Sequence, residues 1–579
     1  MPKLTQAERV FVLLWAAFVV AVAGLPYALA ASWAGPDRYF AGFIAGVDDC
    51  NAYLAWTRQA SEGNLFLSNQ YTIAPQNPRF FSLFFLALGW VCRLGGLRPV
   101  EAFHLARLVG IPVTLYAFYC LCAFMTPRRL VRAAALIIVS VSSGLGWLFT
   151  LRVYGGGRPL AFPVDCAAGW QAMPEAITYL SFLLNPLFTW SLALLCAGLL
   201  WAWSALGEGS WSKAILAGIL LLVLGNVHTY DLFPAWAAVF FGALLAGRYG
   251  GLGIGRALGL CGVNVVLSAP AAAWAWYNSQ ADPAWLAKIS TPTPSPRPVD
   301  YALGFGLVLL AALPGAWAAW ARRREDWRAS AAVFWAAAAF AFAYAPVSFQ
   351  RKMIEGEHLA LSFLAALGLV VAVPLLAERL RRPAVAPNEL YARRRRLAIH
   401  LLTVFIVLTV PSNVVFVTDA LTHTAANNAT LLRVLMPPAY LTADEVAGLQ
   451  WLSANSSFAD VVMSSSLIGN HIPAWCPARV VAGHWAETLN FRAMLQTVAT
   501  FYAPGIDPAI RDEILRNTGA TYVWWGQYEQ LIQRSMQPAA QRAVGAPVHL
   551  PDPPNRQLAS LSEAFRQGEV VIYRVAVKR

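Results

Sequence analysis

Charge is scarce in this sequence. Only 13% of its 579 residues are charged, 58% are hydrophobic, and the mean hydropathy is +0.52. Soluble globular proteins carry about 25% charged residues, so the composition excludes that class. Apolar runs of about 20 residues recur, the length of a bilayer-crossing helix, and a backbone in lipid must satisfy its hydrogen bonds within the segment. The sequence therefore predicts a polytopic α-helical membrane protein.

Acidic residues are the scarcer of the two charged classes. There are 30 Asp and Glu against 43 Lys and Arg, which leaves a formal net charge of +13. The basic residues stand in short clusters between apolar runs, and this pattern indicates membrane topology and no nucleic-acid partner. Internal repeats are also missing from the sequence, which argues against a transporter built from inverted halves.

About eleven transmembrane spans are predicted from the apolar runs. With the N-terminus on the cytoplasmic side, the densest arginine clusters, at 128–132, 322–328 and 379–396, all fall on that side, as the positive-inside rule requires. We therefore expect a multi-pass protein of the inner (cell) membrane. The predicted spans cover approximately residues 10–33, 104–126, 131–151, 183–204, 212–228, 232–247, 255–276, 301–320, 329–346, 358–377 and 397–417.

One apolar stretch, 80–97, is short and contains Arg93. If it crossed the membrane, every later arginine cluster would move outside, so we expect an interfacial helix within a long first outer loop, 34–103. Residues 1–417 then form a transmembrane domain. Residues 418–579 are not membrane-like, because amphipathic helices alternate there with β-branched strands. This region is predicted to be a small extracytoplasmic α/β domain.

Cysteines are few, and none has the spacing of a zinc site. Of the 8 cysteines, Cys50 and Cys166 each follow an aspartate in a predicted outer loop. An oxidising outer compartment permits disulfides. A bridge between Cys50 and Cys166 would tie the first two outer loops together, and we state it as a hypothesis.

Four groups of polar residues stand at the predicted outer ends of spans. Ionisable residues at a membrane border are functional candidates, although each group also has an ordinary explanation as a solvated turn, a helix cap or a headgroup contact. Taken together, the groups place carboxylates in the first two outer loops and a basic pair in a later outer loop, all on the same predicted side of the membrane. The groups are "VDDC" with Asp48 and Asp49, "FPVDCAAGWQAMPEAITY" with Asp165 and Glu175, "GNVHTYDLFPAW" with His228, Tyr230 and Asp231, and "VSFQRKMIEGEHLAL" with Arg351, Lys352, Glu355 and His358.

This arrangement resembles the glycosyltransferase-C superfamily, which includes protein mannosyltransferases, oligosaccharyltransferase catalytic subunits and aminoarabinose transferases that act on lipid A. The resemblance rests on one N-terminal span, the acidic pair early in a long outer loop, a second acidic site in the next outer loop, and a trailing outer domain. It implies transfer of a sugar from a polyprenyl-phosphate-linked donor on the outer face of the membrane. The acceptor is not identified by the sequence.

The resemblance also implies roles for the acidic residues. Asp48 or Asp49 would take the proton of the acceptor hydroxyl, or one of them would orient the other or bind a divalent cation such as Mg²⁺ or Mn²⁺. Asp165 or Glu175 would assist from the second loop, where the chain lacks a clear second Asp-x-Asp motif. Two adjacent carboxylates can raise one another's pKa, which suits a base that works near neutral pH.

Displacement of a lipid phosphate from an anomeric carbon also needs cations that stabilise the departing phosphate. Arg351 could serve by its fork of donors and Lys352 by its point charge, with His358 as a further donor. A transporter or flippase of lipid-linked saccharides and an inactive envelope-assembly scaffold stay open as alternative functions. Further substrate-binding candidates are His228, Tyr230 and Asp231 in the third group, and His484 and Glu487 in the segment "VVAGHWAETLNF" of the outer domain.

Overall fold

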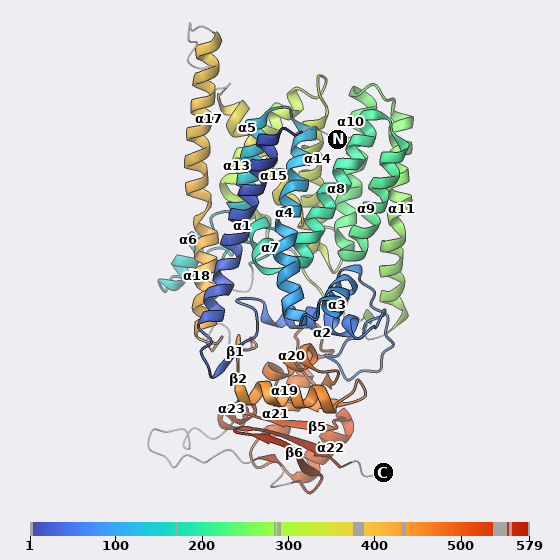
Figure 1. Ribbon diagram of the computed structural model, residues 1–579, viewed down its shortest axis with the longest axis vertical. Coiled ribbons are helices and arrows are strands. Elements are labelled where there is room, and N and C mark those ends of the chain that lie inside the picture. Colours follow the sequence, from blue (N-terminus) through green and yellow to red (C-terminus); the bar gives the residue numbers. More distant parts are fainter. Residues whose placement is uncertain are drawn as a thin grey trace. The chain divides into compact units, whose positions relative to one another are not determined.

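The computed structural model describes residues 4–168, 172–282, 285–286, 291–374, 387–429, 436–536, 553–554 and 558–576 (Figure 1). The chain folds as two compact units that interleave along the sequence. The helical unit takes residues 1–26, 104–277 and 292–420, whereas the mixed unit takes 27–103, 278–291 and 421–579. The predicted first outer loop therefore folds together with the C-terminal region of the chain.

Nine helical stretches in the part of the chain that the structure describes are long and apolar enough to cross a membrane, as expected of a multi-pass membrane protein. The spans predicted at 212–228 and 329–346 are shorter helices, α9 (Trp211–Val227) and α14 (Arg328–Phe342), of 17 and 15 residues. The prediction of about eleven spans exceeds the number of full-length stretches by these two. The nine are α1 (Gln6–Ser32), α4 (Pro99–Met125), α5 with α6 (Arg129–Val141, Gly146–Tyr154), α8 (Pro186–Glu208), η1 with α10 (Thr229–Asp231, Leu232–Tyr249), α11 (Ile254–Ala281), α13 (Pro298–Ala321), η2 with α15 and η3 (Gln350–Ile354, Glu357–Leu367, Gly368–Ala372), and α17 with α18 (Pro387–Thr409, Pro411–Ala425).

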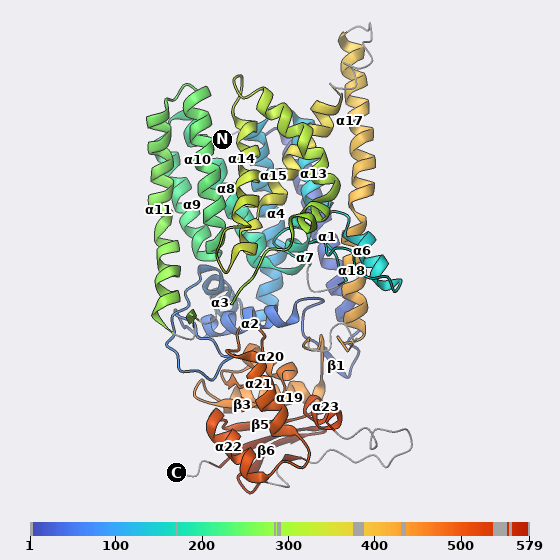
Figure 2. The same cartoon turned by 180° about the vertical axis from the view of Figure 1, so that it is seen from behind.

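Helix α15 is the central helix of the helical unit, and all 11 of its residues are buried. It packs against α5, α13 and α14, while α8, α9, α10 and α11 run side by side in both views (Figures 1 and 2). Helix α13 approaches α15 closely at Gly315, where a Cβ atom would lie only 1.8 Å from the Leu364 carbonyl oxygen. In lipid there is no hydrophobic driving force that brings helices together, so they associate by close packing. Small residues such as glycine allow the backbones to approach closely.

The C-terminal part of the mixed unit is built on a five-stranded sheet in the order β4-β3-β5-β7-β6. Strand β3 pairs in parallel with β4 and β5, and β7 pairs antiparallel with β5 and β6. Helices lie between the strands along the chain, which confirms the predicted small α/β domain. The strands are β3 (Val461–Met463), β4 (Arg479–Val480), β5 (Tyr522–Trp525), β6 (Leu561–Gln567) and β7 (Val570–Val575), and the helices are α19 (Ala443–Asn455), α20 (Ser466–Trp475), α21 (Phe491–Tyr502), α22 (Pro508–Thr518) and α23 (Gln527–Ser535).

Both faces of this sheet are covered by helices. The side chains of Tyr522 and Trp524 point to the face packed by α19 and α20, together with part of α2. Those of Val523 and Trp525 point to the opposite face, which α21 and α22 cover. Alternation along the central strands therefore fills two apolar layers, which explains why β3 (VVM) and β5 (YVWW) contain no charged residues.

The first outer loop contributes two helices and a strand to the mixed unit. They are α2 (Val47–Ser61), α3 (Leu83–Gly95) and β1 (Arg38–Phe40), and β1 pairs antiparallel with β2 (Tyr440–Thr442). Helix α3 covers the stretch predicted to be interfacial, and its 13 residues are too few to cross a bilayer. Helices α2 and α3 meet at Gly89, where a Cβ atom would lie 2.5 Å from the Ala60 Cβ.

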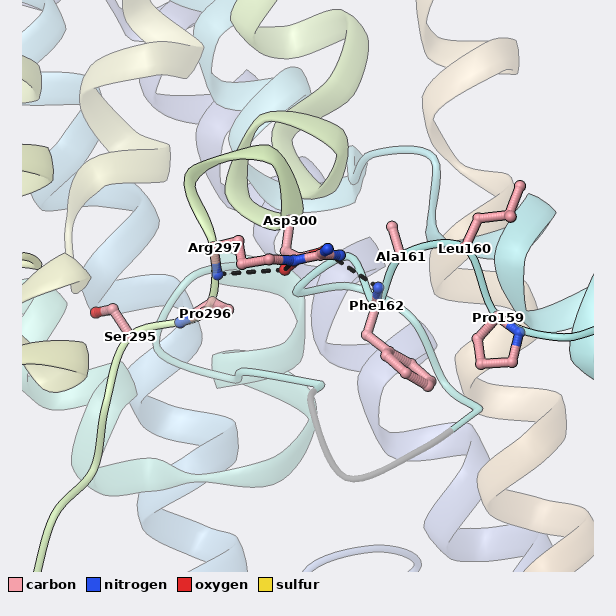
Figure 3. Close-up of a pocket in the computed structure, with 8 residues that line it drawn as sticks. All are labelled: Pro159, Leu160, Ala161, Phe162, Ser295, Pro296, Arg297 and Asp300. Atoms are coloured by element: carbon pink, nitrogen blue, oxygen red, sulfur yellow. Dashed lines mark hydrogen bonds and ion pairs between the residues drawn. The ribbon is translucent and has the colours of Figure 1, made fainter.

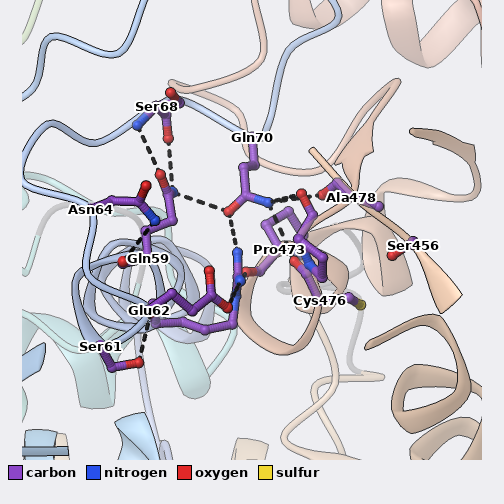
Figure 4. Close-up of polar contacts among 12 residues, drawn as sticks. Gln59, Ser61, Glu62, Asn64, Ser68, Gln70, Ser456, Pro473, Cys476 and Ala478 are labelled. Atoms are coloured by element: carbon purple, nitrogen blue, oxygen red, sulfur yellow. Dashed lines mark hydrogen bonds and ion pairs between the residues drawn. The ribbon is translucent and has the colours of Figure 1, made fainter. Parts of the chain in front are cut away.

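A buried glutamine joins α2 to the end of α20 (Figure 4). Gln70 accepts hydrogen bonds from Arg58 Nη2 at 2.6 Å and from Gln59 Nε2 at 3.0 Å, through its Oε1 atom. Its Nε2 atom donates to the carbonyl oxygens of Cys476 and Ala478 at 3.3 and 3.1 Å. One amide therefore satisfies side-chain groups of α2 and backbone groups of the segment 476–478.

Candidate functional site

The acidic pair of the first outer loop opens helix α2. Gly46 precedes the helix with φ 59°, a left-handed conformation that glycine adopts without strain. Asp48 and Asp49 then stand in the first turn, where the helix dipole favours negative charge. Successive helical residues point about 100° apart. As a result Asp48 is buried, with 7% of its surface exposed, whereas the Asp49 side chain is 59% exposed.

A histidine from the far end of the chain contacts Asp49. His484 Nε2 lies 3.0 Å from Asp49 Oδ1, and its Nδ1 atom accepts hydrogen bonds from the backbone N–H groups of Ala486 and Glu487 at 3.1 and 3.2 Å. Because Nδ1 accepts, the neutral ring carries its proton on Nε2 and donates it to Asp49. The turn is closed by Thr488, whose Oγ1 accepts from the His484 backbone N–H at 3.2 Å.

Burial and charge act together on this pair. Burial raises the pKa of the Asp48 carboxyl, and the neighbouring charge of Asp49 raises it further. Burial lowers the pKa of His484, but the hydrogen bond to Asp49 and the charges of both aspartates outweigh it, so its pKa is raised. Protonation of His484 would add a hydrogen to Nδ1, which now accepts hydrogen bonds from the backbone N–H groups of Ala486 and Glu487. Donor would then face donor, so the 484–488 turn by itself disfavours the imidazolium form of His484.

The sequence candidates of the third and fourth groups come together in the helical unit. His228 and Asp231 lie on the short η1 connection between α9 and α10, and Glu355 lies directly after η2. His228 Nδ1 is 2.9 Å from Asp231 Oδ1 and 3.0 Å from Glu355 Oε2. Ser191 of α8 donates a short hydrogen bond to Glu355. The sequence pattern pointed to Glu355 as a member of the fourth group without giving it a role, and it did not point to Ser191.

The basic pair of the fourth group lies beside this cluster on η2. Arg351 Nη2 is 3.5 Å from Glu175 Oε1, which joins the second and fourth sequence groups by an ion pair. Lys352 Nζ lies 4.8 Å from the centroid of the Tyr230 ring, a cation–π contact to the third group. Arg351 and Lys352 are thus each in contact with a predicted site residue from another loop, Glu175 and Tyr230 respectively.

Asp165 and His358 are enclosed by hydrogen bonds of the helical unit. Asp165 accepts from the backbone N–H groups of Gly144 at 2.8 Å and Gly146 at 3.1 Å, and it thereby closes the connection between α5 and α6. Burial raises the pKa of Asp165 to about 6 despite these bonds. His358 contacts Thr178 Oγ1 at 3.1 Å, at the start of α7 (Thr178–Leu184). Their predicted parts in catalysis and donor binding stay predictions.

Neither Cys50 nor Cys166 takes part in a disulfide in the structure, in contrast to the suggested bridge, and both thiols are buried. Cys50 packs in an apolar cluster of the mixed unit with Phe43 and Phe103. Cys166 belongs to the helical unit, where its Sγ atom lies 3.3 Å from Thr150 Oγ1. Each thiol fills a packing position of its own unit, and adjacency to an aspartate in the sequence carried no information about pairing.

Two clusters among the described residues could hold a metal ion: Asp48, Asp49 and His484, and His228, Asp231 and Glu355. In the first cluster His484 is a poor ligand, because its Nε2 atom carries the proton while Nδ1 accepts two backbone bonds. The second cluster has no such obstacle. The cation that the sequence suggested at the acidic pair is therefore the weaker of the two possibilities.

A separate pocket of about 460 Å³ lies in the helical unit. Figure 3 shows Arg297 and Asp300 at its wall, where Arg297 Nε donates to Asp300 Oδ2 at 3.0 Å. The charge of Arg297 is thus already balanced. The lining comes from two loop segments, Pro159, Leu160, Ala161 and Phe162 on one side and Ser295, Pro296, Arg297 and Asp300 on the other.

Comparisons with known proteins identify structures with a similar fold. The sequence matches no family model and no curated protein. The structure is similar to that of ArnT from Cupriavidus metallidurans bound to undecaprenyl phosphate, with a TM-score of 0.50 and 15% identity over 97% of this chain and 98% of that one. It is also similar to the oligosaccharyltransferase AglB from Archaeoglobus fulgidus in complex with an inhibitory peptide and a dolichol-phosphate, with a TM-score of 0.50 and 12% identity over 88% of this chain and 69% of that one.

Both structures are membrane glycosyltransferases of the glycosyltransferase-C type. The resemblance drawn from the sequence is therefore confirmed at the level of the fold. Identities this low carry the fold alone, so the activity and the site residues of this chain must be argued from its own side chains.

Proposed function

We propose that this protein transfers a sugar from a polyprenyl-phosphate-linked donor to a hydroxyl, or a similar nucleophile, of an acceptor on the outer face of the membrane. The fold supports this, because the similar structures include one bound to undecaprenyl phosphate and one bound to a dolichol-phosphate. The observation within the chain that carries the proposal is the pair of Asp49 and His484, an exposed carboxylate held by a buried imidazole.

Asp49 is the better candidate for the base of the two aspartates. A general base must reach the proton that it removes, and the Asp49 side chain is accessible whereas Asp48 is buried. In the proposed step Asp49 takes the acceptor proton, the acceptor oxygen bonds to the anomeric carbon, and the bond from that carbon to the phosphate oxygen breaks. The electron pair leaves with the lipid phosphate. His484 keeps Asp49 oriented by donating from Nε2.

Arg351 and Lys352 are proposed to stabilise the departing phosphate. Arg351 has a partly exposed side chain, with 33% of its surface accessible, and its partner Glu175 holds it from one side only. A phosphate would offer it a stronger charge-assisted contact than the 3.5 Å ion pair. The alternative of a transporter gains no support from the pair of Asp49 and His484. A carboxylate hydrogen-bonded to an imidazole is suited to proton transfer, and passage of a saccharide has no need of one.

The function is tested with the purified full chain in liposomes that contain a library of polyprenyl-phosphate-linked sugars and total membrane lipids as acceptors. Mass spectrometry identifies the donor that is consumed. We expect Asp49→Asn to lower the initial rate by about 100-fold or more, since general-base catalysis typically contributes 10²–10⁴. We expect Asp48→Asn to cause a smaller loss.

The matched control is Glu62→Gln, which removes another carboxylate at the end of α2 and can keep a hydrogen bond to Arg58. Its rate should match that of the unmodified protein. Full activity in Asp49→Asn and in the double aspartate variant would remove the base assignment. If no donor in the library were consumed by the unmodified protein, sugar transfer itself would have to be abandoned.

A further inference from the structure

Three ionisable side chains from two connections that are far apart in the sequence meet inside the helical unit. His228 and Asp231 come from the connection between α9 and α10, and Glu355 comes from the connection that leads into α15. Their side chains are 7%, 0% and 0% exposed. The loops are therefore packed around the polar groups, and water cannot surround any of the charges.

The hydrogen bonds of this cluster are incomplete. His228 Nδ1 is bonded to Asp231 Oδ1, and Ser191 Oγ donates to Glu355 Oε1. Within the described residues, Asp231 Oδ2 and Glu355 Oε2 are buried and have no hydrogen-bond donor. Buried polar atoms are almost always satisfied, so two unsatisfied carboxylate oxygens in one cluster require an explanation.

The charge of the cluster is unbalanced as well. Two carboxylates face a single imidazole, which can carry at most one positive charge. The ion pairs of Asp231 and Glu355 in the described part of the chain involve only His228. Lys352, on the adjoining η2, lies over the Tyr230 ring. A buried carboxylate without a full counter-charge is costly, and a cation bound between the two acids would remove that cost.

The geometry suits a small cation. Glu355 Oε2 lies 3.0 Å from His228 Nδ1. Asp231 Oδ1 lies 2.9 Å from the same nitrogen. Ligands bonded to zinc at 2.0–2.1 Å in a tetrahedral arrangement stand roughly 3.3 Å apart, so the two distances to His228 Nδ1 need to lengthen by only a few tenths of an ångström. The ligand atoms of all three residues lie within 4.8 Å of one another.

We propose that His228, Asp231 and Glu355 form a binding site for a divalent transition-metal ion of the zinc class. One imidazole and two carboxylates balance a 2+ charge, and an imidazole ligand favours zinc over Mg²⁺ or Ca²⁺. Ser191 orients the Glu355 carboxylate from outside the ligand set. Gly356 permits the turn behind Glu355, since it has φ +88° and a Cβ atom there would lie 2.5 Å from Leu195 Cδ2.

The site fastens two loops of the helical unit, the one before α10 and the one before α15. Its ligands lie at η1 or directly beside η1 and η2, next to the cations proposed to bind the donor phosphate. Three protein ligands leave a fourth position open, as in zinc sites that accept water or another ligand. The binding site itself does not depend on the proposed sugar transfer, because metal content is measured without a donor.

The test uses the full chain in lipid nanodiscs, stripped with a chelator and then equilibrated with ZnCl₂. Elemental analysis should find about one zinc ion per chain, and the X-ray absorption edge should report one imidazole with oxygen ligands. Calorimetric titration should show affinity lowered by about 100-fold or more in His228→Gln, Asp231→Asn and Glu355→Gln, since loss of an outer-shell partner alone costs 10–100-fold.

Two control variants should keep the zinc. His358→Gln removes another buried histidine of the same unit, and Asp49→Asn alters the other cluster that could hold a metal. Binding lost in Asp49→Asn but kept in Glu355→Gln would overturn the proposal. So would a stripped wild-type chain that takes up no zinc, which would mean that the two acids share a proton instead. If a cluster variant does not fold, the absorption spectrum of the unmodified protein still decides the ligand set.

Discussion

Asp48 and Asp49 are neighbouring residues of the same type, and their side chains point from the first turn of α2 into different environments. One turn of α2 buries Asp48 and leaves the Asp49 side chain 59% exposed. The buried carboxyl has a raised pKa, whereas the exposed one can meet a substrate and is held by His484. Solvent access therefore distinguishes the two aspartates, with Asp49 as the proposed base and Asp48 as its buried neighbour.

At this residue scale we expect the pH profile of sugar transfer to depend on His484. As the pH falls through the raised pKa of His484, the imidazolium withdraws charge from Asp49 and loosens the 484–488 turn, so the rate should fall. His484→Gln keeps an N–H that can reach Asp49 but cannot become charged. The variant should retain part of the activity and show an acid limb shifted to lower pH.

The control for this measurement is His471→Gln, which removes a second buried histidine of the mixed unit that hydrogen-bonds elsewhere. Its pH profile should keep the wild-type acid limb. An unshifted acid limb in His484→Gln, measured as donor consumption from pH 5 to 9, would reduce His484 to a packing residue.

At the scale of elements, the acidic pair depends on how α2 is fixed within the mixed unit. Gln70 joins α2 to the segment 476–478 through its single amide, and Arg58 and Gln59 both donate to it. Helix α20 adds a contact from Asn470 Nδ2 to the Asp48 carbonyl oxygen at 3.3 Å. The segment after β4 that carries His484 and the helix that carries Asp49 thereby belong to one unit.

We expect Gln70→Leu to destabilise the mixed unit by about 2–4 kcal/mol, because it leaves the buried Arg58 and several carbonyl oxygens without a partner. Hydrogen exchange of the full chain in detergent should report faster opening at α2 and at 476–480. Gln567→Leu, at an exposed position of β6, should change the unfolding free energy by less than about 0.5 kcal/mol. Equal exchange in both variants would contradict the role given to Gln70.

At the scale of the whole molecule, the number of crossings decides on which sides of the membrane the two ends of the chain lie. Nine crossings, or eleven if α9 and α14 also cross, would put the two ends of the chain on opposite sides. Ten crossings would place them on the same side. The parity therefore rests on two helices of 17 and 15 residues.

Cysteine labelling checks this parity, and the eight native cysteines are buried and give a low background. We expect an impermeant maleimide to label Ser562→Cys on intact cells and to label Arg129→Cys only after the membrane is opened, because the arginine clusters favour the cytoplasmic side. Both native residues are exposed. Labelling of both positions on intact cells would overturn the proposed orientation.

The sequence by itself determined the class of molecule. Low charge and repeated apolar runs require helices in lipid, and the alternation of helix and strand after residue 418 requires an α/β fold, because these are local patterns. Hydropathy also located α9 with its 17 residues, but it placed the end of α14 at residue 346, whereas this helix ends at Phe342. That end is set by the turn that follows, which a window of apolar residues does not record.

Only the tertiary structure decided which candidates meet. His484 contacts Asp49 across 435 residues of chain, and Glu355 reaches His228 from a different loop. It also decided which aspartate is exposed and that Cys50 and Cys166 are separate packing residues. Such contacts depend on how distant segments pack, whereas composition and periodicity describe only near neighbours along the chain. The sequence could therefore nominate the groups of a site, and folding alone could bring them together.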